Sequence, residues 1–144
     1  MKRFAAVLTL SFMVILLPSW LAAQEVKTLI DRGVANLENG KFDQALDDFN
    51  QALKLKPNDA SLYDYRGIAY RTNGLDDQAL QDFNKAIQLD PKFARAYRNR
   101  AMVYYDKTEY GKAVVELDKA QSLGYRLDQD FVKMVRRKAA EKQQ

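Results

Sequence analysis

Small and apolar side chains return to the same places in this chain with a period of 34 positions, without insertions. A period of this length that carries small, aromatic and proline positions in a fixed order is typical of stacked helical hairpins. The pattern therefore predicts an all-α solenoid of three antiparallel helix pairs. The repeated sets are Gly33, Gly67 and Ala101; Ala45, Ala79 and Ala113; Phe49, Phe83 and Leu117; Ala52, Ala86 and Ala120; and Pro57 with Pro91.

Each period predicts two helices joined by a short turn. Gly40 and Gly74 can adopt the left-handed conformation that ends a helix tightly. Pro57 and Pro91 cannot continue a helix, so each marks the end of a hairpin. Gly67 and its equivalents allow the two helices to approach closely. The predicted helices are 26–38 with 42–55, 60–72 with 76–89, and 94–106 with 110–123.

The segment 128–144 follows the third period. Phe131, Met134 and Val135 share one face at helical spacing, and Asp128 is a candidate cap. We expect a seventh helix that covers the exposed apolar face of the third repeat, since repeat arrays need such an end. The alternative is a basic amphipathic helix that binds an anionic surface.

Charged residues also follow the period. Arginine precedes the small residue of each first helix, and an acidic residue follows it sixteen positions later. Because the turn lies midway, an antiparallel hairpin brings the two positions together. We expect the ion pairs Arg32–Asp48, Arg66–Asp82 and Arg100–Glu116, with arginine stems covering apolar surface. The alternative is that Arg66 and Arg100 reach the neighbouring repeat or solvent.

Residues 1–23 resemble a secretory signal peptide. Lys2 and Arg3 precede an apolar run that ends at Pro18, and small residues precede Gln24. We expect cleavage before Gln24 and export, to the periplasm in a Gram-negative bacterium and otherwise to the outside of the cell. The alternative is an uncleaved membrane anchor, because residues 4–23 carry no charge.

The composition excludes several kinds of chemistry. The chain contains no cysteine and no histidine, which excludes disulfides, thiol catalysis and Cys/His metal sites. Paired aspartates such as Asp47 and Asp48 are neighbours on a helix and do not face each other. No calcium or phosphate-binding loop accompanies them. We therefore expect no enzyme activity, no cofactor and no metal.

The net charge differs between the two parts of the expected mature chain. Residues 24–91 hold 8 basic and 12 acidic side chains, and residues 92–144 hold 13 basic and 7 acidic ones. A charge dipole along a solenoid steers charged partners to one end. An uneven solvated surface with no such role is the other interpretation.

The order of the repeated residues resembles the tetratricopeptide repeat family. That family's repeat has an aromatic residue, Leu-Gly, Tyr, Ala, an aromatic residue, Ala and Pro. The resemblance covers repeats 26–59, 60–93 and 94–127, and implies a right-handed superhelix. Its concave face is lined by the first helix of each pair and binds peptides or partner helices. The second repeat matches best, through Tyr63, Gly67, Tyr70, Gly74, Ala79, Phe83, Ala86 and Pro91.

The resemblance also points to groove residues. Val34, Ile68 and Met102 recur at one groove-facing position, as an apolar strip or as packing within the stack. Family members that clamp chaperone tails use lysines and asparagines at defined positions, where Arg95 and Asn99 give only a partial match. We therefore expect a different peptide, apolar or with acidic edges. The candidate binding residues are Ile30, Val34, Tyr65, Ile68, Arg71, Arg95, Arg98, Asn99, Met102 and Tyr105.

Three functional hypotheses remain open at this point. The first is an exported, non-catalytic scaffold or adaptor whose partner is a protein or peptide. The second is a soluble or self-associating subunit of an envelope assembly. The third is nucleic-acid binding through the basic C-terminal half, where tyrosines lie among arginines. Export disfavours the third hypothesis.

Overall fold

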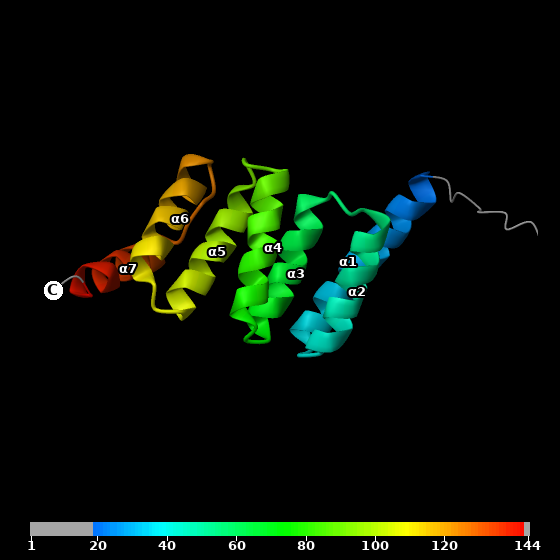
Figure 1. The fold of residues 1–144 in the computed structure, drawn as a ribbon, viewed down its shortest axis with the longest axis horizontal. Helices are drawn as coiled ribbons and strands as arrows, with labels where there is room; N and C mark the ends of the chain where they lie inside the picture. The colour runs from blue at the N-terminus through cyan, green and yellow to red at the C-terminus, as the bar shows by residue number, and fades with distance from the viewer. Residues whose placement is uncertain (1–18, 143–144) are drawn as a thin grey trace, which may run out of the picture.

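A computed structural model describes residues 19–142, and within them it contains seven helices and no strand. The helices follow one another in a row of antiparallel hairpins (Figure 1). The first members of the pairs are α1, α3 and α5, and the second members are α2, α4 and α6. Their bounds are α1 Ser19–Glu38, α2 Phe42–Leu55, α3 Ala60–Thr72, α4 Asp76–Leu89, α5 Ala94–Asp106, α6 Tyr110–Ser122 and α7 Gln129–Glu141.

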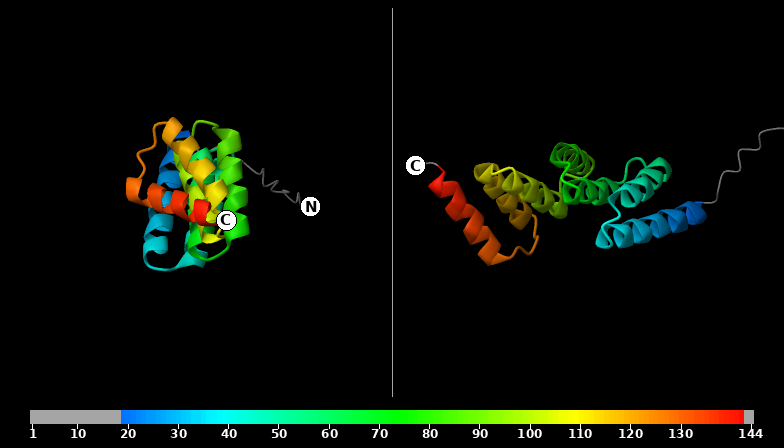
Figure 2. Two further views of the ribbon diagram at one scale, coloured as in Figure 1. Left: turned by 90° about the vertical axis from the view of Figure 1, so that its left-hand side faces the viewer. Right: turned by 90° about the horizontal axis from the view of Figure 1, so that it is seen from below.

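The elongated array is an all-α solenoid, as the repeat predicts. Within each pair the two helices pack along their length, and each pair stacks on the next (Figures 1 and 2). The seventh helix packs on α6 at the C-terminal end. Five of the six predicted repeat helices end at or within one residue of the predicted positions at both ends, so the repeat period fixes these boundaries well.

The first helix is longer than predicted. It begins at Ser19, directly after Pro18 in the sequence, and not at Val26. Its added residues bury little, because Trp20 is 69% exposed and Ala23 is exposed, while the buried side chains begin at Val26. The repeated positions predict which residues pack against one another. They do not predict how far a helix continues beyond its packed residues. The predicted leader falls mostly on residues 1–18, which lie outside the described part of the chain.

Each hairpin is closed by a small residue that meets a large one. A Cβ added to Gly33 would lie 2.7 Å from Phe49, and one added to Gly67 would lie 2.6 Å from Phe83. Both phenylalanines are completely buried. In the third repeat, alanine replaces the glycine and Leu117 replaces the phenylalanine, and both remain buried. The smaller leucine therefore leaves the room that the extra methyl group needs.

The three turns share one conformation although their sequences differ. Gly40 and Gly74 have φ of 70° and 74°, and Thr108 has φ of 58°. The same backbone bond closes each turn, as in the donation from Glu109 N–H to the Tyr104 carbonyl at 2.8 Å. Positive φ is unfavourable for a β-branched residue. Packing of the hairpin therefore imposes this turn on Thr108.

The three predicted ion pairs are present. Arg32 Nε donates to Asp48 at 2.8 Å, and Arg66 binds Asp82 through Nε and Nη2, both at 2.7 Å. Arg100 binds Glu116 in the same way, at 2.7–3.0 Å. The pairs are shielded from water on the acidic side, since Asp48 and Asp82 are buried.

Arg66 and Arg100 also reach the neighbouring repeat, which was the alternative to pairing within the hairpin. Each of them binds a residue of the preceding repeat. Arg66 Nη1 donates to Asn50 at 2.7 Å, and Arg100 Nη1 donates to Asn84 at 2.6 Å. Asn50 on α2 and Asn84 on α4 occupy the same position of successive repeats. One guanidinium thus joins both helices of its own hairpin to the hairpin before it.

The seventh helix covers the last repeat. Val132 and Val135 are buried in one cluster with Ala101 and Leu117, and Phe131 packs against that cluster. Asp128 caps the helix by accepting bonds from the backbone N–H groups of Asp130 and Phe131 at 2.8 and 3.1 Å. Arg136 forms an ion pair with Asp118, which occupies the position of Asn84 in the third repeat. The helix thereby continues the polar contacts that join one repeat to the next.

We predict that the contact between Gly67 and Phe83 is a coupled pair. Gly67→Ala should lower the free energy of unfolding by about 1–3 kcal/mol, because the new methyl group overpacks the hairpin. Phe83→Leu should recover part of that loss in the double variant, as in the third repeat. Gly111→Ala is the matched control, since no atom lies within 4 Å of its added Cβ. Urea unfolding of the four variants measures the coupling, and additive losses would contradict it.

We predict a second coupling between Arg66 and Asp82. A double-mutant cycle with alanine at both positions should give a coupling energy of about 1–3 kcal/mol, because the Asp82 side chain is only 7% exposed. The pair Lys133–Asp130 is the control, with side chains 76% and 94% exposed, and should show no measurable coupling. Equal results for the two cycles would remove the ion pair as a source of stability.

Candidate functional site

The first helices of the three repeats form one continuous inner surface. Helix α1 packs on α3 and α3 packs on α5, whereas α2, α4 and α6 make no comparable contacts with one another within residues 19–142. The first helices therefore lie closer together than the second helices. All ten predicted binding residues lie on α1, α3 and α5, and none of them is fully exposed.

The apolar strip is partly used by the packing of the stack. Val34 packs against the cluster of Ala45, Phe49 and Ala69, and Ile68 packs against the equivalent cluster around Phe83. Ile30 packs in the same way beside Val26 and Leu29. All three keep part of their surface open to the groove. They form the floor of the groove and also support the core.

Tyr65 lies on α3, the middle one of the three first helices, and its ring has two aromatic or cationic contacts. Its ring stacks on Phe49 with 5.8 Å between centroids and an interplanar angle of 13°. The guanidinium of Arg95 lies over the ring, 4.7 Å from its centroid. This packing gives Tyr65 a role in stability as well as a place on the surface.

A buried carboxylate beneath Tyr65 is the main feature that the sequence did not reveal. Asp64 is completely buried, and its Oδ2 lies 2.7 Å from Arg95 Nε. Its Oδ1 accepts a hydrogen bond from Asn99 Nδ2 at 2.9 Å. Asn99 in turn accepts a bond from Arg98 Nη1 at 3.0 Å. Three predicted binding residues are thus brought together by an acidic residue that was not predicted.

Burial and the neighbouring polar groups act in opposite directions on the pKa of the Asp64 carboxyl. Burial raises the pKa of its carboxyl, and the nearby charge of Arg95 and the bond from Asn99 only partly oppose this rise. Burial disfavours the charged form of any carboxyl group. The Asp64 carboxyl contacts one nitrogen of each neighbour, Arg95 Nε as an ion pair and Asn99 Nδ2 through a hydrogen bond. The two residues that best matched a chaperone-tail clamp therefore both contact Asp64 within the chain.

The remaining predicted residues mark the C-terminal end of the groove. Tyr105 packs edge-on against Phe131 of α7, with 5.6 Å between ring centroids. Arg71 forms an ion pair with Asp106 at 2.8 Å. The groove thus ends where Phe131 of α7 contacts Tyr105 of α5. Met102 and Arg98, about one and two turns earlier on α5, stay partly exposed.

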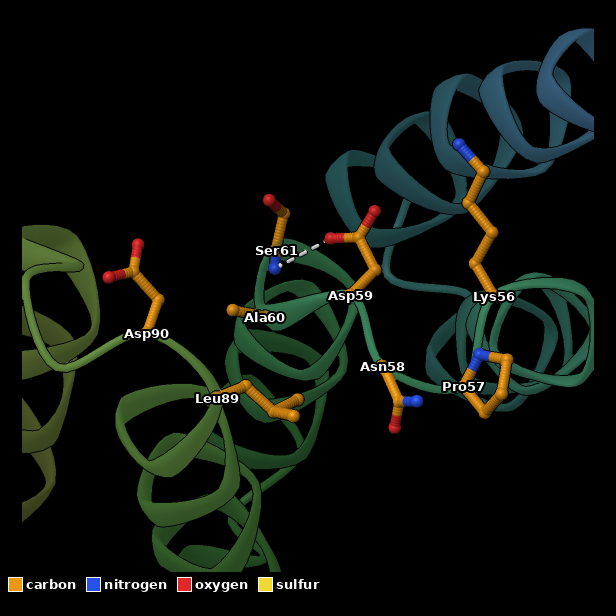
Figure 3. Close-up of a pocket in the computed structure, with 8 residues that line it drawn as sticks. All are labelled: Lys56, Pro57, Asn58, Asp59, Ala60, Ser61, Leu89 and Asp90. Atoms are coloured by element: carbon orange, nitrogen blue, oxygen red, sulfur yellow. Dashed lines mark hydrogen bonds between the residues drawn. The ribbon is translucent and has the colours of Figure 1, made fainter.

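A separate hollow lies at one end of the helices, away from the ten predicted binding residues. It measures about 580 Å³ between the α2–α3 connection and the end of α4 (Figure 3). Asp59 lines it and accepts a bond from Ser61 N–H at 2.9 Å, so the α3 N-terminus is already capped. The carboxylate of Asp90 adds a second negative charge. The hollow therefore combines two carboxylates with one lysine, Lys56, and has no excess of positive charge for an anion.

Metal binding and membrane crossing find no support in residues 19–142. They contain no group of three or more His, Cys, Asp or Glu side chains arranged to hold a metal ion. Over the same residues, no helix has the length and apolarity that crossing a membrane requires.

Comparison with known proteins identifies similar folds. A family model described as tetratricopeptide repeat matches residues 30–92 and 77–124. The first TPR of Spaghetti (RPAP3) bound to HSP90 peptide SRMEEVD is 20% identical, with TM-score 0.74 over 81% of this chain and 94% of that one. The Sgt2 TPR domain from Aspergillus fumigatus is 24% identical, with TM-score 0.77 over 83% and 82%. The TPR2B domain of yeast Sti1 in a complex with pHsp70 is 24% identical, with TM-score 0.72 over 83% and 98%.

These structures confirm the predicted right-handed solenoid. No curated protein matches the chain. At these sequence identities the solved structures show the fold, and the nature of a ligand has to come from the groove itself.

We predict that the stability contribution of Asp64 falls as the pH rises. Its pKa is higher in the folded chain than the unfolded value of about 3.9, so the folded state holds the proton more tightly. The contribution is therefore most favourable below that unfolded value and declines as the pH rises through the folded pKa. Asp64→Asn removes the titration. The unfolding free energy of the wild type minus that of the variant should decrease between about pH 3 and pH 7. An increase would show that the charge of Arg95 outweighs burial.

Proposed function

This chain belongs to the tetratricopeptide repeat family, and we propose on that basis that it is a non-catalytic module that binds a protein segment in the groove of α1, α3 and α5. The observation that carries the proposal is the composition of the open end of this groove. Arg98 is partly exposed there beside the apolar Met102, and it donates a hydrogen bond to the neutral Asn99. An arginine beside an apolar surface is a common anchor of protein interfaces.

The charge of the groove favours a segment with acidic side chains. Residues 92–144 carry 13 basic and 7 acidic side chains, and Arg98 belongs to this part of the chain. The similar domain of Spaghetti binds the peptide SRMEEVD, which is also acidic. The partial match to a chaperone-tail clamp is weakened further because Arg95 and Asn99 both contact Asp64. The proposed ligand combines apolar and acidic side chains and binds nearer to α7.

We also propose that the protein is exported as a scaffold or adaptor and that its mature form begins at Gln24. The basic start and the apolar run of residues 2–17 support a leader. Cleavage before Gln24 would remove the exposed Trp20 and would leave Val26, the first buried residue of α1, in place. The core described above is therefore compatible with loss of the segment 1–23.

Site-specific photocrosslinking tests the groove. Thr72 suits the probe because it is exposed and lies on the same face of α3 as Tyr65 and Ile68, seven and four residues earlier. A photoreactive residue at Thr72 should capture a partner protein in the producing cells. The same residue at Val115, which is 65% exposed on α6, should not capture it. Capture from Val115 alone, or of a second copy of this chain from Thr72, would contradict the proposal.

Export has its own measurement. Mass spectrometry of the protein recovered from the producing organism should find Gln24, free or cyclised, at the N-terminus. A chain that starts at Met1 and needs detergent for extraction would show an anchor and would refute cleavage. Removing residues 1–23 should leave the urea midpoint of unfolding unchanged, because the buried side chains begin at Val26.

A further inference from the structure

A pocket lies at the C-terminal end of the groove, between α5 and the connection that leads from α6 to α7. It measures about 350 Å³, within the range of sites that hold a small ligand or a side chain. Met102 from α5, Leu127 from the connection and Phe131 from α7 provide apolar lining. Arg98 and Arg126 line the same pocket. The pocket thus combines an apolar interior with two positive charges from separate elements.

These two arginines differ from the others in the described chain. Arg98 and Arg126 are the only arginines among residues 19–142 with no carboxylate oxygen within 4.0 Å. Every other arginine in that range has such a partner, at positions 32, 66, 71, 95, 100, 136 and 137. The two guanidinium groups without a carboxylate therefore lie at a single site.

The acidic residue of the pocket does not neutralise them. Asp128 also lines the pocket, but its Oδ1 accepts the backbone N–H groups of Asp130 and Phe131 at the start of α7. The nearby Asp64 is engaged by Arg95 and Asn99. Both acids are held in structural roles, so the charges of Arg98 and Arg126 remain available to a ligand.

We infer that this pocket binds an apolar side chain of a partner peptide, with acidic side chains on either side of it that pair with Arg98 and Arg126. The inference rests on the proposed function and specifies the ligand for one end of the groove. A guanidinium binds one carboxylate through two parallel hydrogen bonds. A chain terminus with an apolar last residue and no acidic side chain supplies a single carboxylate, which leaves one arginine without a carboxylate of its own. An internal segment of the form acidic–apolar–acidic supplies both.

The pocket is formed where the last repeat meets α7. Arg126 and Leu127 end the third repeat, Asp128 follows it, and Phe131 belongs to α7. Arg98 and Met102 come from the first helix of that repeat. The seventh helix therefore has a second role, in which it completes a binding pocket as well as covering the core.

The test is an NMR titration of the ¹⁵N-labelled chain with the peptide Ser-Glu-Leu-Glu-Ser, acetylated and amidated so that its ends carry no charge. Shifts should concentrate on the amides of Met102, Leu127 and Phe131. Arg126→Gln should weaken binding about threefold to tenfold, since one carboxylate pair is lost. Arg137→Gln is the matched control, because Arg137 is exposed on α7 and pairs with Glu141. It should leave the affinity unchanged.

Three further peptides identify the features that matter. Replacing both glutamates by glutamine, or leucine by serine, should abolish measurable shifts at the pocket. Ser-Ser-Leu with a free carboxylate should bind more weakly than the acidic peptide. Tighter binding of this tripeptide at Met102 and Phe131 would assign the pocket to a chain terminus and overturn the inference. So would an absence of binding, equal binding of the glutamine peptide, or an unchanged affinity of Arg126→Gln.

Failure of this inference can be separated from failure of the proposed function. If Arg126→Gln reduces peptide affinity, photocrosslinking from Thr72 should fall in the same variant. If Thr72 captures a partner equally well with Arg126→Gln, the groove binds proteins and the pocket is not their anchor. If Thr72 captures nothing in either form, the proposed function itself is wrong.

Discussion

The close contact between a small residue on the first helix and a large one on the second sets the geometry of the whole array. At Gly33 and Gly67 there is no room for even one methyl group against the buried ring opposite. A small residue opposite a large one recurs in every repeat. The third repeat pairs the buried Ala101 with the buried Leu117, so the constraint acts on the summed volume of the pair.

A polar layer uses this fixed spacing to connect neighbouring repeats. Each arginine that precedes the small residue is placed opposite an acid of its own hairpin, and Arg66 and Arg100 also bind an asparagine of the hairpin before. The guanidinium of Arg66 lies 5.5 and 5.8 Å from the ring centroids of Tyr63 and Tyr70. Aromatic faces and a bidentate acid together suit arginine and not lysine. The repeated charge is therefore part of the stack, which leaves it unavailable for ligands.

The sequence predicted what repeats and missed what does not. The helix boundaries, the hairpin contacts and the three ion pairs all follow from the period, because each is enforced three times. Asp64 gave no signal, since its equivalents are Ile30 and Arg98, and its partners Arg95 and Asn99 lie in the next repeat. The pocket beside α7 was missed because Asp128 and Phe131 lie beyond the last repeat and Arg98 stands where the earlier repeats have Ile30 and Asp64. The start of α1 was missed because unpacked helix leaves no pattern in the sequence.

The same distinction separates stability from recognition in this molecule. Arginines at repeated positions find repeated acids, and Arg95 finds the buried Asp64, so their charges are neutralised inside the chain. Arg98 is not at a repeated arginine position, since the second repeat has Asp64 there. Asp64 is also not free to pair with Arg98, because it already contacts Arg95 and Asn99. A seventh helix whose only role was to cover the core would require an apolar face and would not require an arginine without a carboxylate partner beside it.

The connection to α7 instead places Arg126 in the same pocket as Arg98. The positive charge that the fold does not use is thereby gathered where the repeats end, and this end of the groove is where selectivity for an acidic partner arises.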